Sequence, residues 1–538
     1  MTPKNVCVVG SGPVGLPLSV RLAQGGLRVL LLEAGSQAPD RVHQSDLEAQ
    51  TSADSRHAPM NLAVCRALGG TSWLWGGRCV PLDAIDFAVR LWIPESGWPL
   101  QEKDVAPYYQ AAAAALGCGP AEFLCSGPQI FAGGLNLDKM ERWCNKPLLP
   151  AVRDNKSLPG NIFLCLDTMV TGLSLTPDKT RVRGARIASG EKTTVFSGPP
   201  IFVLACGGLE TTRLLLNVQA QQPELFGGTQ GPLGRHYMGH LSGHIANIVF
   251  DDPRRAVLFA YRDSKDSAIR CRMTLSEGAQ TAKQLPNISF APDNPKMNDP
   301  AHGSGILSAI FLLLCTPVIG PRLISEAIRQ MQMTDNPRYL QHLRNILLDF
   351  PRTFVTALNL AWQKFVIGRR KPFLFLPSRS GEYPLHYHAE HIGHAESRVQ
   401  LGDELDVRGL RRLKIDQRFT QRDSDGVVRA HQALDEALRK SRLGRLVYHD
   451  GAEARGASVL AQVHDGFHQM GLLRMGTHAQ DGVVDQNCRV FGLDNMFVVG
   501  TGVFRTSGQA NPTFFATALG LRVADHIAEG FPPRTAAK

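Results

Sequence analysis

Three glycines near the N-terminus have the spacing of a phosphate-binding loop. Gly10, Gly12 and Gly15 form a G-x-G-x-x-G motif that follows an apolar run at 6–9 and opens a helix-like stretch at 16–24. Glycine at these places allows a tight turn, close approach of the backbone to a pyrophosphate, and close packing of the helix on the strand. The helix N-terminus would face the phosphates. The motif therefore predicts a dinucleotide site; the alternative is a purely structural glycine turn.

A carboxylate stands where such a site needs one. A second apolar run at 28–32 ends in Glu33, which could accept hydrogen bonds from both ribose hydroxyls of an adenosine. An acidic residue here favours FAD or NAD over NADP, and it does not choose between the first two. The complete strand–helix–strand context favours the dinucleotide interpretation over the structural turn.

Histidines recur in two places where a metal site is conceivable. His464 and His468 are four residues apart, so a helix there would carry both on one face. No carboxylate or cysteine of matching spacing follows, and we predict no metal at this pair. His386 and His388 would share one face of a strand, where metal binding is again the minority interpretation.

Composition and charge narrow the class of protein. The chain has 538 residues, of which 43% are hydrophobic and 20% charged, and its formal net charge is +10. These values exclude a disordered or fibrous protein and provide for a large core. The basic residues form only one concentrated stretch, so we expect no nucleic-acid partner.

The cysteines and the apolar runs indicate the cellular compartment of the protein. Eleven cysteines show no C-x-x-C pair and no regular spacing. We expect buried free thiols in a reducing compartment and no iron–sulfur cluster. The first residues lead straight into a strand-like run, which leaves no room for a secretory signal. The longest apolar run, at 306–319, contains Pro317 and is shorter than the ~20 residues of a membrane span. We expect a soluble, cytoplasmic protein, with peripheral membrane contact as an alternative.

Three further segments combine glycine-rich turns with apolar runs. They lie at 67–78, 202–213 and 468–502. The first contains two tryptophans, and the second reads as a strand that runs into a Gly-Gly turn and a helix. The third begins with His468 and ends in a Gly-Thr-Gly turn, after which Asn511 precedes a proline and a last helix at 513–528.

Taken together, these segments resemble the glucose–methanol–choline (GMC) oxidoreductases, a family of flavoenzymes. The motifs occur at both ends of the chain and in family order. Within the family the likeness is to pyranose oxidases and bacterial FAD-dependent sugar or fructose dehydrogenases. It is carried by Gly500-Thr501-Gly502, by the ending at 508–513 and by the stretch at 388–403.

The resemblance implies a fold of two parts, α/β together with α+β. A Rossmann-type, glutathione-reductase-like FAD-binding domain would comprise residues 1–100, 155–240 and 465–538. A substrate-binding domain of antiparallel sheet covered by helices would comprise residues 101–154 and 241–464. Alternating runs within 161–203 fit the β-meander of such FAD-binding domains.

The resemblance also implies a catalytic pair. His468 would be the base that accepts the hydroxyl proton while flavin N5 takes a hydride from carbon, since a neutral imidazole suits that task. Asn511 would hydrogen-bond the same substrate oxygen and fix its orientation. Each has a plainer alternative, because His468 could be an ordinary surface or core histidine and Asn511 a turn residue before proline.

The expected cofactor is FAD. The residues expected to contact it are Gly10, Gly12, Pro13, Val14, Gly15, Glu33, Ala34, Gly69, Gly70, Ser72, Trp75, Gly76, Gly77, Val170, Ala205, Gly207, Gly500, Thr501, Asn511, Pro512 and Thr513. Pyranose oxidases tether the flavin through a histidine near this chain's Trp73 and Leu74, and no histidine stands there. We therefore expect a non-covalent flavin.

A basic helical insert at about 305–371 is the remaining feature. Nine Lys/Arg and three Asp/Glu lie between 322 and 371, and apolar residues recur there at helical spacing. An ordinary solvated helix is the favoured interpretation; the alternative is an amphipathic element that touches anionic lipid or covers an apolar part of the substrate.

These observations predict a flavoenzyme that oxidises a hydroxyl of a sugar or glycoside to a carbonyl. The first alternative is the same chemistry on an apolar alcohol such as a sterol, long-chain or lipid-linked alcohol. The second is a redox-silent lyase or a flavin-bearing membrane component. The electron acceptor, whether oxygen, a quinone or a protein, stays open.

Overall fold

The apolar runs of the N-terminal region form the centre of a parallel sheet. In the computed structural model its strand order is β22 (Met496–Val498), β11 (Ile201–Leu204), β1 (Asn5–Val9), β2 (Arg28–Leu32) and β7 (Ile162–Cys165), with every neighbouring pair parallel. β1 and β11 are almost completely buried, as expected where helices cover both faces of a parallel sheet.

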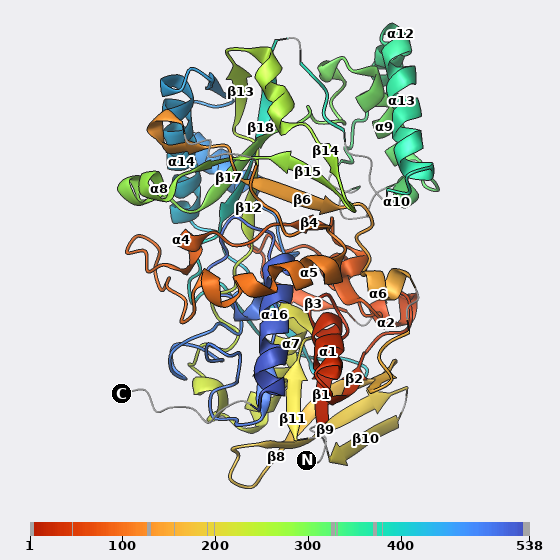
Figure 1. Ribbon diagram of the computed structural model, residues 1–538, viewed down its shortest axis with the longest axis vertical. Helices are drawn as coiled ribbons and strands as arrows, with labels where there is room; N and C mark the ends of the chain where they lie inside the picture. Colours follow the sequence, from red (N-terminus) through yellow and green to blue (C-terminus); the bar gives the residue numbers. More distant parts are fainter. Residues whose placement is uncertain are drawn as a thin grey trace.

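The structure describes residues 5–45, 47–125, 131–154, 157–190, 192–197, 200–323, 329, 332–369, 374–378 and 380–530. Helices α1 (Gly15–Gln24), α7 (Gly207–Gln221) and α16 (Thr513–Ala528) lie beside this sheet, and α5 (Tyr109–Leu116) packs on α16 (Figure 1). The ends of α16 agree with the predicted helix at 513–528. The predicted mixed helix-and-sheet fold is confirmed.

The segment expected to form a β-meander divides between two sheets. β8 (Met169–Leu175), β9 (Val182–Ser189) and β10 (Lys192–Ser197) form an antiparallel three-stranded sheet. The flanking strands β7 and β11 instead join the parallel sheet. The meander is therefore shorter than predicted, because both ends of the segment are apolar enough to enter the buried sheet.

A larger antiparallel sheet occupies the opposite end of the molecule (Figure 1). Its strand order is β21 (Gly444–Tyr448), β13 (Ala246–Phe250), β18 (Glu382–Glu390), β17 (Ile288–Pro292), β16 (Met273–Leu275) and β5 (Leu135–Asn136), with β12 (His240–Gly243) also paired to β18. α14 (Gln421–Lys440) packs against this sheet through a separate apolar core. α15 (Arg455–Gln462) lies against α14.

Smaller elements connect the two large sheets. A four-stranded sheet has the order β14 (Arg262–Ser264), β15 (Ser267–Cys271), β6 (Met140–Cys144) and β4 (Arg78–Cys79), and a three-stranded one β19 (Arg398–Leu405), β20 (Arg411–Asp416) and β3 (Ala49–Thr51). The short helices are α2 (Arg41–Ser45), α3 (Met60–Ala63), α4 (Ala84–Phe87), α6 (Pro150–Arg153) and α8 (Glu277–Lys283). β4 and β6 place residues 78 and 141 beside the candidate site described below.

One expectation about the cysteines is wrong. Cys125 and Cys271 form a disulfide across 146 residues of sequence, and the other nine cysteines are free. The pairing depends on β15 and the segment before β5 lying side by side, which spacing along the chain does not reveal.

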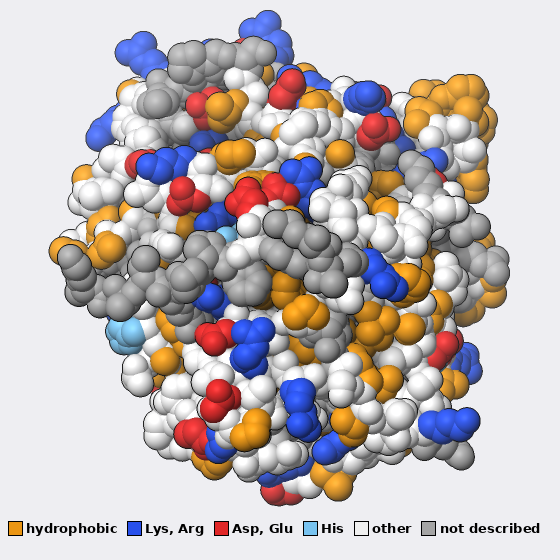
Figure 2. All heavy atoms as spheres, turned by 60° about the horizontal axis from the view of Figure 1, so that its bottom comes forward, with side chains coloured by type: hydrophobic (Ala, Val, Ile, Leu, Met, Phe, Trp, Pro, Cys, Tyr) orange, Lys and Arg blue, Asp and Glu red, His pale blue; other side chains and the backbone are white. Residues whose placement is uncertain are grey.

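Among its described residues, the expected basic insert contains α9 (Gly305–Cys315), α10 (Gly320–Leu323), α12 (Tyr339–Leu348) and α13 (Phe350–Phe365). Residues 324–328, 330–331 and 370–371 of that prediction lie outside the described residues. α12 and α13 project at one edge of the molecule (Figure 1), and apolar side chains gather on the protruding surface of that side (Figure 2). Within the described chain, no helix combines the length and the apolar character that crossing a membrane requires.

Candidate functional site

His468 lies in a loop that a buried carboxylate organises. The Asp465 Oδ1 atom accepts hydrogen bonds from the backbone N–H groups of Gly466, Phe467 and His468, at 2.7, 2.9 and 3.2 Å. The Oδ2 atom accepts from the Nδ1–H of His468 at 3.0 Å and from the backbone N–H of His240 at 2.6 Å. This loop fixes both the position and the tautomer of the His468 ring.

The charge state of Asp465 follows from these contacts. Burial opposes ionisation, but the attraction of His468 and the hydrogen bonds from His468 and the His240 backbone outweigh it, so the pKa of Asp465 lies well below its ordinary value. A carboxylate on Nδ1 leaves Nε2 of His468 as a proton acceptor. The imidazole therefore has the form that a general base requires.

Asn511 donates the hydrogen bond that Nε2 of His468 accepts. Its Nδ2 donates to Nε2 of His468 at 3.0 Å, although the two residues are 43 positions apart. Its Oδ1 accepts from Nη1 of Arg78 at 2.7 Å, and Nε of Arg78 donates to Oε2 of Glu141 at 2.7 Å. Arg78 thus orients the amide of Asn511 so that its donor end faces His468.

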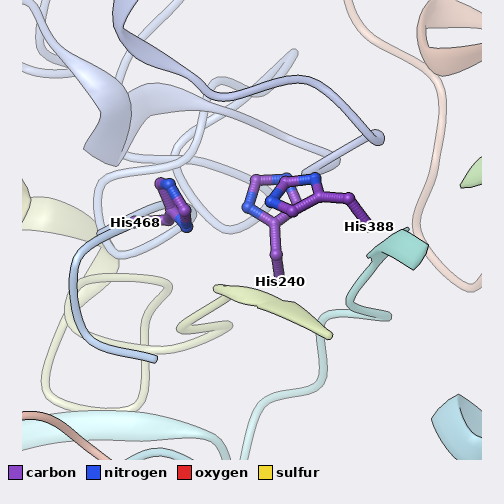
Figure 3. Close-up of side chains that lie close together, drawn as sticks. All are labelled: His240, His388 and His468. Carbon is purple, nitrogen blue, oxygen red and sulfur yellow. The ribbon is translucent and has the colours of Figure 1, made fainter. Parts of the chain in front are cut away.

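Two further histidines face His468 from neighbouring strands. His240 comes from β12 and His388 from β18, and their ring centroids are 4.2 Å apart (Figure 3). The His240 ring lies 4.6 Å from that of His468, nearly perpendicular to it. The Nδ1 of His388 donates to the backbone oxygen of Gln509 at 2.8 Å. Burial lowers the pKa of both strand histidines well below the ordinary value, so both are neutral.

His240 has unmet hydrogen-bonding capacity. The residue is only 2% exposed, and among the described residues neither ring nitrogen has a hydrogen-bond partner. The backbone of Ser507 lies near the ring without reaching hydrogen-bond geometry. A buried polar atom without a protein partner is accounted for by water, an ion, a ligand or a catalytic role.

The helix that would have carried His464 and His468 on one face does not extend to them. α15 ends at Gln462, so the residues that follow are not helical, and His464 is exposed. His240, His388 and His468 instead form the close group, with one ligand nitrogen from each lying within 4.8 Å of the others. His386 points elsewhere: its Nε2 pairs with the Ser242 hydroxyl at 2.9 Å.

A large open cleft adjoins this group of histidines. It lies between the carboxyl ends of the parallel strands and the C-terminal loops. Residues on either side of the two catalytic candidates line it: Phe467 and Gln469 around His468, and Pro512 and Thr513 after Asn511. The candidate pair therefore lies at the edge of the cleft.

Most of the predicted cofactor contacts line this cleft. They are Gly10, Gly12, Pro13, Val14, Glu33, Ala34, Gly70, Val170, Ala205, Gly207, Gly500, Thr501, Pro512 and Thr513. The predicted contacts that do not line it are Gly15, Gly69, Ser72, Trp75, Gly76, Gly77 and Asn511. Trp75 turns toward the segment before α6, donating from Nε1 to the Pro147 oxygen at 2.7 Å.

The three glycines of the N-terminal motif face different surroundings. A Cβ on Gly15 would lie 2.0 Å from the Gly10 carbonyl oxygen, and one on Gly10 would lie 2.6 Å from the Ala205 oxygen. A Cβ on Gly12 would approach nothing closer than the Cα of Gly70, at 3.9 Å. Protein packing thus explains Gly10 and Gly15 but not Gly12, which lines the cleft.

Comparison with known proteins finds a family match in the C-terminal part of the chain. Residues 393–520, which include His468 and Asn511, match the model of the family described as GMC oxidoreductase. This region of the chain is thus similar to the GMC oxidoreductases.

Curated relatives match only part of the chain. It is 34% identical over 142 residues to a C-glycoside 3-oxidase of Arthrobacter globiformis, covering 25% of this chain and 24% of the relative. It is 36% identical over 66 residues to a 2-methyl-1,2-propanediol dehydrogenase of Mycolicibacterium austroafricanum, covering 12% of each. The match thus spans at most about a quarter of the length of these relatives.

Solved structures share the fold over nearly the whole chain. A formate oxidase superposes with a TM-score of 0.54 at 14% identity, covering 99% of both chains. A fungal aryl-alcohol oxidase gives 0.53 at 12% identity, covering 98% of this chain and 99% of its own. At these identities the likeness shows the fold alone.

The residues that line the cleft fit FAD, the cofactor that GMC oxidoreductases bind. The cleft beside Gly12 lies at the N-terminus of α1, whose free backbone N–H groups are suited to binding phosphate. Glu33 accepts from Ser11 N, Ser11 Oγ and Gly35 N at 2.9, 2.6 and 2.9 Å. A carboxylate has about four lone-pair sites, so capacity remains for a ribose hydroxyl.

Sequence reasoning missed several residues of this site. Asp465 stands three positions before His468, and this spacing is the one feature of the sequence that could have indicated a carboxylate beside the histidine. Arg78 and Glu141 lie close together because β4 pairs with β6. His240 and His388 lie close together because β12 pairs with β18, although the two strands are far apart in the sequence. No pattern along the chain connects them.

Proposed function

We propose that this protein is an FAD-dependent oxidoreductase that oxidises a hydroxyl group of a sugar or glycoside to a carbonyl. The contact that supports it best is the 3.0 Å pair between His468 Nε2 and Asn511 Nδ2 at the edge of the cleft. When bound, FAD supplies the acceptor for the hydride that leaves the substrate carbon.

Each side chain of the site has a separate role toward the substrate hydroxyl. His468 takes the hydroxyl proton at Nε2, and the carboxylate of Asp465 stabilises the imidazolium that results. Asn511 donates from Nδ2 to the hydroxyl oxygen and so holds it toward the base. Arg78 keeps the amide of Asn511 in the required orientation through its bond to Oδ1.

The polar surroundings of His468 support a polyol as substrate. Among the described residues, His240 offers two buried ring nitrogens without partners, and its ring contacts that of His388 beside the base. A sugar hydroxyl would satisfy such a nitrogen, whereas an apolar alcohol would leave it buried and unpaired at a cost of about 1–3 kcal/mol. The C-glycoside 3-oxidase among the relatives, by its name, acts on a glycoside and so supports the same substrate class.

A second candidate is the same oxidation of an apolar alcohol. The exposed apolar side chains of α12 and α13 favour it. An apolar substrate leaves water more easily where the protein offers it an apolar surface. We place it second because the residues around His468 itself are polar.

The flavin is proposed to be non-covalent. Trp73 and Leu74 occupy the place where tethered relatives carry a histidine, and Trp73 is held by its Nε1–H bond to the Leu68 oxygen at 3.0 Å. Acid precipitation of the purified protein should therefore release the yellow chromophore into the supernatant. Colour that stays with the precipitate would contradict this part of the proposal.

The test of the oxidation is anaerobic mixing of the holoenzyme with sugars, glycosides and apolar alcohols while the flavin absorbance is followed. We expect bleaching by the sugar or glycoside class. His468→Ala should keep the flavin spectrum but slow bleaching by about 10²–10⁴-fold, the range of general base catalysis.

The matched control is His464→Ala, which removes an exposed histidine four residues away. It should bleach at the wild-type rate. Equal rates for His468→Ala and wild type would overturn the proposed base, and bleaching by apolar alcohols alone would select the second candidate.

A further inference from the structure

α12 and α13 present large apolar side chains to the outside of the molecule. In α13 these are Phe350, Phe354, Leu358, Trp362 and Phe365, each between 53% and 79% exposed. In α12, Leu340, Leu343 and Leu347 are exposed between 48% and 81%. Monomeric soluble proteins seldom expose so many neighbouring large apolar groups, so this face requires a partner.

The spacing places these side chains in one stripe on each helix. They recur every three or four residues in both helices, which puts them on a common face. The only buried residues are His342 in α12 and Thr353 in α13, on the opposite sides, toward α9. The stripes therefore point away from the protein, where apolar side chains are seen on the protruding surface (Figure 2).

The charged residues within α12 and α13 are all basic, and Asp349 lies between the two helices. Neither helix contains an Asp or Glu, whereas Arg344, Arg352 and Lys364 are present. Arg344 and Arg352 are exposed, and within the described part of the chain neither has an acidic partner. Such a surface is complementary to one that is apolar inside and negative outside.

We propose that α12 and α13 bind the surface of a membrane that contains anionic lipid, with both helices lying in the plane of the interface. α13 has 16 residues, about 24 Å at 1.5 Å per residue, which is shorter than the ~30 Å of a bilayer core. The apolar stripes enter the region below the headgroups, and the arginines contact the lipid phosphates. This inference does not depend on the proposed oxidation.

The experiment is co-sedimentation of the full-length holoenzyme with two kinds of vesicle. One contains phosphatidylcholine alone and the other contains phosphatidylcholine with phosphatidylglycerol. We expect clear binding to the second and weaker binding to the first, with binding reduced but not abolished at high salt, since salt screens only the charge contribution.

Two variants separate the apolar and the ionic contributions. Leu347→Ser/Phe354→Ser/Leu358→Ser should lower partitioning onto both kinds of vesicle by at least about tenfold. Arg344→Glu/Arg352→Glu should lower it on the anionic vesicles and leave the neutral ones almost unchanged. Both variants should keep the flavin spectrum, which shows that they are folded.

The matched control removes equally exposed apolar side chains elsewhere: Val42→Ser/Val195→Ser/Val407→Ser. It should bind vesicles like the wild type. Failure of the wild type to bind either vesicle, or equal loss in the control, would overturn the proposal. So would a stable dimer that the triple serine variant dissociates, because a second copy would then cover the face.

Discussion

At the scale of single residues, the site is a line of hydrogen bonds with His468 at its centre. Asp465 holds one ring nitrogen, and Asn511 contacts the other under the control of Arg78. Because catalysis depends on orientation, residues that never touch substrate should still change the rate.

Asp465→Asn tests the carboxylate. The amide has nearly the same shape but cannot stabilise the imidazolium, so flavin reduction should slow by about 10²-fold or more, and its dependence on pH should change shape. Stopped-flow reduction across pH 6–9 is the measurement. Wild-type rates at every pH would mean that Asp465 only shapes the loop.

His240→Leu tests recognition of the polyol. Loss of the unpartnered imidazole should raise the KM for a sugar substrate by about tenfold, with little effect on any apolar alcohol that is turned over. Steady-state kinetics on both classes distinguishes them. An equal rise for both would assign His240 to packing.

Zn²⁺ should inhibit the enzyme. Three imidazoles with nitrogens within 4.8 Å of one another can hold the ion, and the bound ion would withdraw His468 from its role as base. Titration of activity with ZnCl₂ should show inhibition that EDTA reverses and that His240→Ala weakens. Undiminished inhibition in that variant would place the ion elsewhere.

At the scale of elements, the turn from β1 into α1 separates two uses of glycine. Gly15→Ala forces a Cβ to within 2.0 Å of the Gly10 oxygen, so the apoprotein should lose about 1–3 kcal/mol of stability or fail to fold.

In Gly12→Ala the new Cβ comes no closer to other protein atoms than 3.9 Å, the distance to the Cα of Gly70. The apoprotein of this variant should therefore unfold like the wild type yet bind FAD poorly. Thermal unfolding of the apo forms and flavin titration measure both. A yellow, fully loaded Gly12→Ala protein would contradict the proposed approach of the pyrophosphate.

At the scale of the whole molecule, two apolar cores form around different sheets. One surrounds the parallel sheet, and also takes in α5 and parts of β19 and β20; the other lies between the large antiparallel sheet and α14. The proposed bounds of an FAD-binding domain at 1–100, 155–240 and 465–538 follow the first core in outline. Limited proteolysis with and without FAD would test those bounds.

Buried histidines should make the whole fold sensitive to acid. Burial lowers the pKa of His431 to about 4, and those of His236 and His386 to about 4 and about 3, whereas an unfolded histidine titrates near 6.5. Between these values the unfolded chain binds more protons, so stability is present at neutral pH and declines as the pH falls below about 6.5. At pH 5 each such histidine should cost about 2 kcal/mol.

His431→Gln tests this in α14, away from the site. The difference in Tm between pH 7 and pH 5 should be smaller for this variant than for the wild type. His464→Ala, which removes an exposed histidine, is the control and should behave like the wild type. Identical curves for His431→Gln and the wild type would show that His431 does not contribute.

What the sequence determined by itself was local. The glycine motif with its strand, helix and Glu33 and the last helix after Asn511 follow from residues close together in the chain, because turns and short elements depend on neighbouring side chains. The tertiary structure decided which distant groups meet: Arg78 with Asn511, His240 with His388, Cys125 with Cys271, and the outward direction of the stripes on α12 and α13. These contacts depend on how strands pair and helices pack across hundreds of residues, and no spacing within one segment encodes that arrangement.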